Sequence, residues 1–306
     1  MGVPGGNQEA KALMPTAKTS TRLTFDNILF PTDFTGASDA ALPYVLAVAR
    51  WYGAKVFVTH AVAPPTPLSI PLEPIPLEMD ALWQEARRRA DQFLQSHCLG
   101  DTRKEVILEQ GAMWSVLSNV IRKHSVDLIV LGTHGRHGLK KLVLGSSAEQ
   151  IFRQAPCPVL TIGPKVSATA VVDRLKTILF ATDFSSGSLH ALPYALSLAE
   201  ENEAAITLLH SIPLVPLHHQ ETVRGSAIRR LQSLLPFDAT DWCRPNSVVR
   251  FEFPVEAILR QAEEEHADLI VMGVHRHAPH ASAHLPWAIA YEVVCRGSCP
   301  VLTVRG

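Results

Sequence analysis

The chain has 306 residues, of which 47% are hydrophobic and 19% charged, and its formal net charge is −1 at pH 7. A near-neutral charge gives no general reason to expect nucleic-acid binding. No apolar run reaches the roughly 18 residues that span a bilayer, and residues 1–22 lack the charged start and apolar centre of a secretion signal. The sequence therefore predicts a cytoplasmic protein with no membrane partner.

In the first half, short β-branched runs alternate with amphipathic segments of helical period, a pattern typical of a parallel sheet covered by helices. Residues 1–24 are expected to form a disordered leader, and the proline-rich residues 64–76 an extended crossing loop. The expected strands are 27–31, 55–60, 104–109, 127–131 and 158–162. The expected helices include 38–51, 78–97, 113–124 and 143–154.

The second half repeats the first. The repeated pairs of segments are 27–34 and 177–184, 126–132 and 267–273, and 157–161 and 299–303. The second set of expected strands is 177–181, 205–210, 247–252, 268–272 and 300–304. Two tandem copies of one domain account for almost the whole chain. We expect copy one at 25–163, a linker at 164–174 and copy two at 175–306.

A glycine-rich loop lies between a buried strand and a helix of copy one. Gly132-Thr133-His134-Gly135 follows the strand, and after nine residues Gly145-Ser146-Ser147 begins the helix. Glycines let backbone N–H groups approach an anion, and a helix N-terminus favours negative charge. The loop predicts a cradle for nucleotide phosphates.

Three segments of copy one converge outside the carboxyl ends of the strands, where parallel sheets bind ligands. We expect Asp33 to accept hydrogen bonds from ribose hydroxyls, the backbone at Ala61 to pair with an adenine edge, and the glycine loop to hold the phosphates. The predicted nucleotide-binding residues are Thr32, Asp33, Ala61, Leu131, Gly132, Thr133, Gly135, Gly145, Ser146 and Ser147.

Three short motifs of the chain resemble those of the universal stress protein family: PTDF at 31–34, GxxGx9G[ST] at 132–146 and CPVL at 157–160. The resemblance covers about residues 25–306 and indicates a tandem two-domain member. It implies an α/β fold in which each domain is an open parallel five-stranded sheet with helices on both faces, Rossmann-like and similar to the adenine nucleotide alpha hydrolases.

The same resemblance implies that members with the full glycine motif bind ATP or a related adenine nucleotide, here with or without magnesium. It also implies stress-linked regulatory roles and dimer pairing through the final strand. A tandem chain can form that pairing within itself as an intramolecular pseudo-dimer. Whether two chains also form a homodimer, and which regulatory protein is the partner, is left open.

Copy two departs from the motif after Gly273. Residues 281–290 contain no glycine, and alignment of the Cys-Pro pairs places Trp287 where copy one has Gly145. A tryptophan at the phosphate position would fill the cradle. We therefore expect copy one alone to bind nucleotide, although Asp183 repeats Asp33.

Simpler explanations compete with these assignments. The glycine loop could be only a tight turn, and Asp33 could merely cap the following helix. The histidines His275, His277, His280 and His284 match no ligand spacing, so we expect a solvated loop and no metal site. The five cysteines lack a CxxC pair, and Cys299 is expected to be buried and inert.

The sequence favours a binding module over an enzyme. It contains neither a GxxxxGK[ST] loop nor an SGGxDS run, and no carboxylate pair placed for magnesium and a general base. We therefore predict no catalytic residues. Slow ATP hydrolysis is the first alternative, and a structural or partner-binding protein with a vestigial pocket is the second.

Overall fold

The computed structural model describes residues 23–63, 76–97, 99–133, 145–167, 173–274 and 286–306. Its strands are β1 (Asn27–Pro31), β2 (Lys55–Val62), β3 (Lys104–Gln110), β4 (Leu128–Gly132), β5 (Val159–Ile162), β6 (Thr177–Ala181), β7 (Ala205–Ser211), β8 (Arg244–Arg250), β9 (Leu269–Val274) and β10 (Val301–Arg305). Its helices are α1 (Gly36–Asp39), α2 (Leu42–Tyr52), α3 (Pro76–Ser96), α4 (Met113–Lys123), α5 (Ser146–Gln154), α6 (Ser186–Leu189), α7 (Leu192–Asn202), α8 (Leu217–Gln232), α9 (Ala239–Trp242), α10 (Pro254–Glu264) and α11 (Pro286–Arg296).

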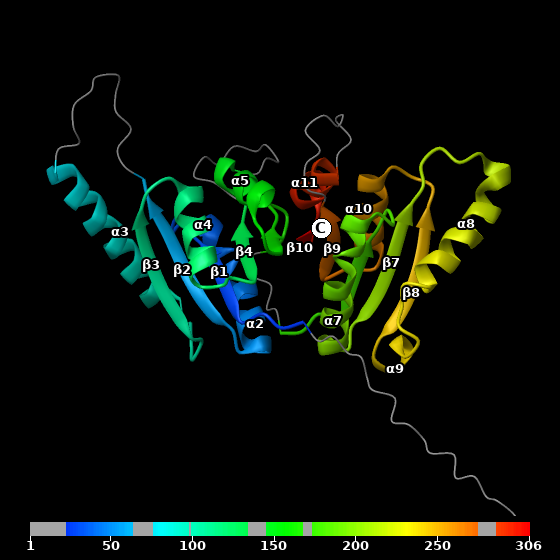
Figure 1. Ribbon diagram of the computed structural model, residues 1–306, viewed down its shortest axis with the longest axis horizontal. Helices are drawn as coiled ribbons and strands as arrows, with labels where there is room; N and C mark the ends of the chain where they lie inside the picture. The colour runs from blue at the N-terminus through cyan, green and yellow to red at the C-terminus, as the bar shows by residue number, and fades with distance from the viewer. Residues whose placement is uncertain (1–22, 64–75, 98, 134–144, 168–172, 275–285) are drawn as a thin grey trace, which may run out of the picture.

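The ten strands form one sheet in the order β3-β2-β1-β4-β5-β10-β9-β6-β7-β8 (Figure 1). Every neighbouring pair is parallel except β5 and β10, which are antiparallel. The two copies are therefore parallel five-stranded sheets joined by their last strands. We call the β5–β10 pair the seam. Among the described residues no helix is long and apolar enough to cross a membrane.

Each predicted strand overlaps an observed one, but the helix expected at 38–51 and the strand expected at 247–252 differ from the structure. The predicted helix 38–51 is divided into α1 and α2, which begins at Leu42 with Pro43 in its first turn. Proline lacks an N–H and is tolerated in the first turn, where helical N–H groups have no intrahelical partner. The strand expected at 247–252 instead spans Arg244–Arg250. Residues 1–22 of the predicted leader, residues 64–75 of the predicted loop and residues 143–144 lie outside the described residues.

Helices cover both faces of the sheet. Successive residues of a strand point to opposite sides, so buried apolar strands need helices packed on each side. Ile28 and Phe30 of β1 lie in a core shared with α2, α3, α7 and α8. Leu29 lies in the other core, with α4, α5, α10 and α11. Both cores extend across the two copies.

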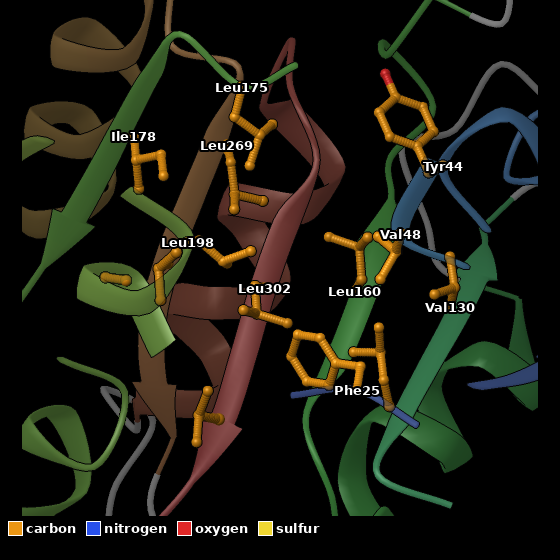
Figure 2. Packing of buried hydrophobic residues seen from close by; sticks show 14 of the residues in the cluster. Phe25, Tyr44, Val48, Val130, Leu160, Leu175, Ile178, Leu198, Leu269 and Leu302 are labelled. Atoms are coloured by element: carbon orange, nitrogen blue, oxygen red, sulfur yellow. The ribbon is translucent and has the colours of Figure 1, made fainter. Parts of the chain in front are cut away.

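Side chains from both copies pack together at the seam. Leu160 of β5 is paired with Leu302 of β10, and Figure 2 shows both beside Phe25. Phe25 stacks on Tyr194 of copy two with ring centroids 6.2 Å apart. In the opposite direction, Trp51 Nε1 donates a hydrogen bond of 2.9 Å to the Asp173 carbonyl ahead of copy two. The segments entering each copy thus contact the other copy.

A glycine of copy one lies directly against the backbone of copy two beside the seam. A Cβ atom on Gly163 would lie 2.2 Å from the carbonyl oxygen of Val294 in α11. A Cβ atom on Gly145, by contrast, would meet no atom within 4 Å. The two glycines provide a matched pair for testing the packing of the two copies.

We expect Gly163→Ala to destabilise the protein by about 1–3 kcal/mol, because β5 and α11 must separate to admit the methyl group. Gly145→Ala should leave stability nearly unchanged. Thermal unfolding of the two variants and the wild type, followed by circular dichroism, measures the difference. Equal midpoints for all three proteins would show that the copies do not pack as described.

Candidate functional site

The chain makes a sharp turn directly after β1. Phe34 adopts the left-handed conformation, with φ 55°, and its N–H donates to Thr32 Oγ1 at 2.9 Å. Asp33 Oδ1 accepts from Thr35 N at 3.1 Å, Thr35 Oγ1 at 2.6 Å and Ser38 Oγ at 2.7 Å. An aspartate that binds the backbone two residues ahead stabilises such a turn. The carboxylate is thereby fixed at the carboxyl end of β1, whereas the N-cap residue of the following helix α1 is Thr35, with no side-chain cap bond.

Beyond β1, the neighbouring strand β2 continues past its partner. The last β1 pair is Pro31 with Thr59, and Thr32 N donates to Thr59 O at 2.9 Å, whereas β2 extends to Val62. Val62 O faces β3, where it accepts from Gly111 N at 3.1 Å. Because peptide groups alternate direction along a strand, the N–H and C=O of Ala61 face the side where β1 has ended. This is the backbone edge expected for adenine.

A histidine and a phenylalanine lie beside that edge. His60 Nδ1 is 2.8 Å from Thr32 O, and the His60 and Phe34 ring centroids are 5.0 Å apart. Neither side chain had an expected role from the sequence. Their repetition in copy two, where His210 contacts Thr182 O at 2.8 Å and the Phe184 ring at 4.4 Å, was the available signal.

The described part of the glycine loop lies at the ends of β4 and α5. Leu131, at 2% exposure, and Gly132 close β4, and Thr133 directs both its N–H and its hydroxyl to Ile162 O, at 3.2 and 3.1 Å. The Thr133 hydroxyl is thus held by β5 in this structure. Gly135 lies outside the described residues.

The N-terminus of α5 faces solvent. Gly145 precedes the helix, and Ser146 and Ser147 in its first turn are exposed. The first N–H groups of a helix have no intrahelical acceptor, so they are available to an anion. The described residues thus place a turn carboxylate, the Ala61 backbone beyond the end of β1, and a helix N-terminus after β1, β2 and β4 of one sheet.

Comparison with known proteins identifies the family. The profile of the universal stress protein family matches residues 24–163 and 174–305. The chain belongs to the universal stress protein family. A universal stress protein of Mycolicibacterium smegmatis is 24% identical over 293 residues, covering 91% of this chain and 96% of that protein. One of Thermus aquaticus is 30% identical over 140 residues, covering 45% and 98%.

A solved structure supports the architecture. The crystal structure of a universal stress protein from Archaeoglobus fulgidus superimposes with a TM-score of 0.70 at 19% identity, covering 91% of this chain and 98% of that one. At this identity the likeness shows the fold alone. The α/β fold with tandem universal stress protein domains, expected from the sequence, is confirmed.

Copy two of this universal stress protein keeps the turn and packs it against β9. Asp183 Oδ1 accepts from Ser185 N at 2.9 Å, so the turn does not depend on the glycine motif. A Cβ atom on Gly273 would lie 2.1 Å from Gly187 O, because α6 contacts the end of β9 directly. The 275–285 loop with its four histidines lies outside the described residues, and of Trp287 only the backbone is described.

Burial favours the protonated form of three of the thiols. Burial raises the pKa of Cys157 and of Cys299 to about 12, and that of Cys243 to about 11. Cys299 is 6% exposed, as the sequence predicted for an inert core residue. Within the described ranges, no cluster of three His, Cys, Asp or Glu side chains could hold a metal ion.

A partly buried carboxyl group, that of Asp39, lies next to the Asp33 turn. Burial raises the pKa of Asp39, and its Oδ1 atom has no hydrogen-bond partner among the described residues. His97, whose Nε2 is 3.8 Å from Asp39 Oδ2, lowers this pKa, and the Asp33 carboxylate raises it. The net direction is upward, so the folded protein disfavours the charged form of Asp39.

We expect Asp39→Asn to raise the thermal midpoint at pH 7, because the amide removes a partly desolvated charge. Because the pKa of Asp39 is raised in the folded protein, its carboxyl group destabilises the fold only where it is ionised. The gain in midpoint from Asp39→Asn should therefore disappear below about pH 3.5, where the wild-type carboxyl group is protonated in both the folded and the unfolded protein. Melting curves across this range measure it, with the exposed Asp91→Asn on α3 as the control. A lower midpoint at pH 7 would show that the His97 pair dominates.

Proposed function

We propose that this universal stress protein is a regulatory module that binds one adenine nucleotide, ATP, in copy one. The observation that carries the proposal is the open N-terminus of α5 at Gly145, at the same end of the sheet as the Asp33 turn and the Ala61 edge. These three features match the phosphate, ribose and adenine of one nucleotide. The resemblance of the glycine motif to that of nucleotide-binding family members supports the same assignment.

Each part of the nucleotide meets a group of suitable chemistry. The Ala61 peptide offers one donor and one acceptor to an adenine edge. Asp33 offers carboxylate oxygens to ribose hydroxyls. The Gly132, Gly135 and Gly145 backbone and the α5 N-terminus offer N–H groups to the phosphates, with the Ser146 and Ser147 hydroxyls beside them. Thr32, Leu131 and Thr133 shape the floor between these groups.

Copy two is proposed to bind no nucleotide. Its sequence replaces Gly145 by Trp287 and Ser146 by Ala288, which removes the open glycine and one hydroxyl. Copy two then serves copy one as a structural or regulatory partner.

Calorimetric titration of nucleotide-stripped full-length protein with ATP and magnesium tests the proposal, with released phosphate followed in the same samples. One site per chain without turnover is expected. Turnover that Asp33→Ala abolishes would establish slow ATP hydrolysis instead. Absence of binding to ATP, ADP and AMP would contradict the proposal and favour a structural role.

We expect Gly145→Trp to abolish ATP binding, because the indole occupies the phosphate position as the copy-two sequence would place it. Gly145→Ala is the matched control, since its methyl group meets no atom within 4 Å, and it should still bind. Titration of both variants, after circular dichroism confirms folding, measures the effect. A folded tryptophan variant with wild-type affinity would refute the phosphate assignment.

A further inference from the structure

An arginine of copy two contacts the C-terminal end of α5, the helix whose N-terminus is proposed to bind the phosphates. Arg305, the last residue of β10, donates through one guanidinium nitrogen to the carbonyl oxygens of Phe152, at 3.4 Å, and of Arg153. Both carbonyls lie in the last turn of α5. The last carbonyls of a helix lack intrahelical donors and carry partial negative charge, so a cation stabilises them. Copy two thus supplies the charged contact at the C-terminus of a copy-one helix.

Copy one has no matching arginine at the position that corresponds to Arg305. Alignment of Cys299-Pro300 with Cys157-Pro158 places Gly163 of copy one opposite Arg305 of copy two. Gly163 lies so close to Val294 O, near the end of α11, that no side chain fits there. The duplication has therefore become asymmetric at the seam. The helix that receives the arginine is the one that begins with the glycine and serines of the nucleotide motif.

A second group of the proposed site is also anchored at the seam. Thr133, after β4, is bound through its N–H and hydroxyl to Ile162 O of β5. β5 in turn pairs with β10, where Thr303 Oγ1 donates to Val159 O at 3.3 Å. Thr133 and α5 are therefore both held by the strand pair that joins the copies.

We propose that Arg305 of copy two is a positioning residue for phosphate binding by copy one. A nine-residue helix is about 14 Å long, so a tilt at its C-terminus displaces the N–H groups at the other end. Binding sites need their groups held within about 0.5 Å of the productive geometry. Copy two thereby controls nucleotide affinity without binding a nucleotide. This inference rests on the proposed function.

The test compares ATP with adenosine, which lacks phosphates, on full-length Arg305→Gln and Arg305→Lys proteins. Arg305→Gln should weaken ATP binding between about threefold and thirtyfold and leave adenosine binding unchanged. Arg305→Lys should restore most of the ATP affinity, since an ammonium group can donate to the same carbonyls. Arg296→Gln is the control, because the Arg296 ion pairs with Glu256 and Glu292 lie within copy two.

Unchanged ATP affinity in Arg305→Gln would overturn the inference, and so would an equal loss for ATP and adenosine, which would indicate a general structural defect. Amide hydrogen exchange of residues 146–154 gives a readout that needs no ligand. Faster exchange there in Arg305→Gln than in Arg296→Gln is expected. If the wild type binds no ATP, the proposed function fails, and the exchange result alone decides whether Arg305 positions α5.

Discussion

The antiparallel pairing of β5 with β10 is the interaction on which the rest of this structure depends. Without it, β5 and β10 would each be an edge strand with one side exposed to solvent. Leu160 and Leu302, which are paired across the seam, would also become more exposed. The pairing makes one ten-stranded sheet and lets both cores run across the two copies. It also brings Arg305 to the end of α5, so the same strand pair that stabilises the fold reaches the proposed binding site.

The duplication separates what the fold requires from what the proposed site requires. Both copies have an aspartate-stabilised turn after their first strand. In both, a histidine of the second strand contacts the carbonyl oxygen of the threonine that precedes this aspartate. These features therefore belong to the fold of each copy. The copies differ at Gly145 against Trp287 and at Gly163 against Arg305. Copy one has the small residue in both pairs, which is the asymmetry expected when one copy binds a ligand and the other supports it.

The sequence predicted the sheet well because buried parallel strands are short β-branched runs, and because each run occurs twice. The helix expected at 38–51 ran across the break between α1 and α2, because Ala40 and Ala41 are good helix formers, although Pro43 does lie in the first turn of α2. The sequence suggested a helix cap as the alternative role of Asp33, whereas its carboxylate stabilises the turn before α1. The hydrogen bonds of Thr133 to Ile162 and the contact of Arg305 with α5 were not predicted from the sequence, because no periodicity links residues 29 or more positions apart.

We propose one nucleotide at the α5 N-terminus of copy one and none in copy two, and a crystal structure of the full-length protein grown with ATP and magnesium is the decisive experiment. We expect phosphate density against the backbone of Gly145, Ser146 and Ser147, with adenine beside Ala61 and no nucleotide after β6 or β9. Nucleotide in copy two, or phosphates held away from α5 in copy one, would contradict it.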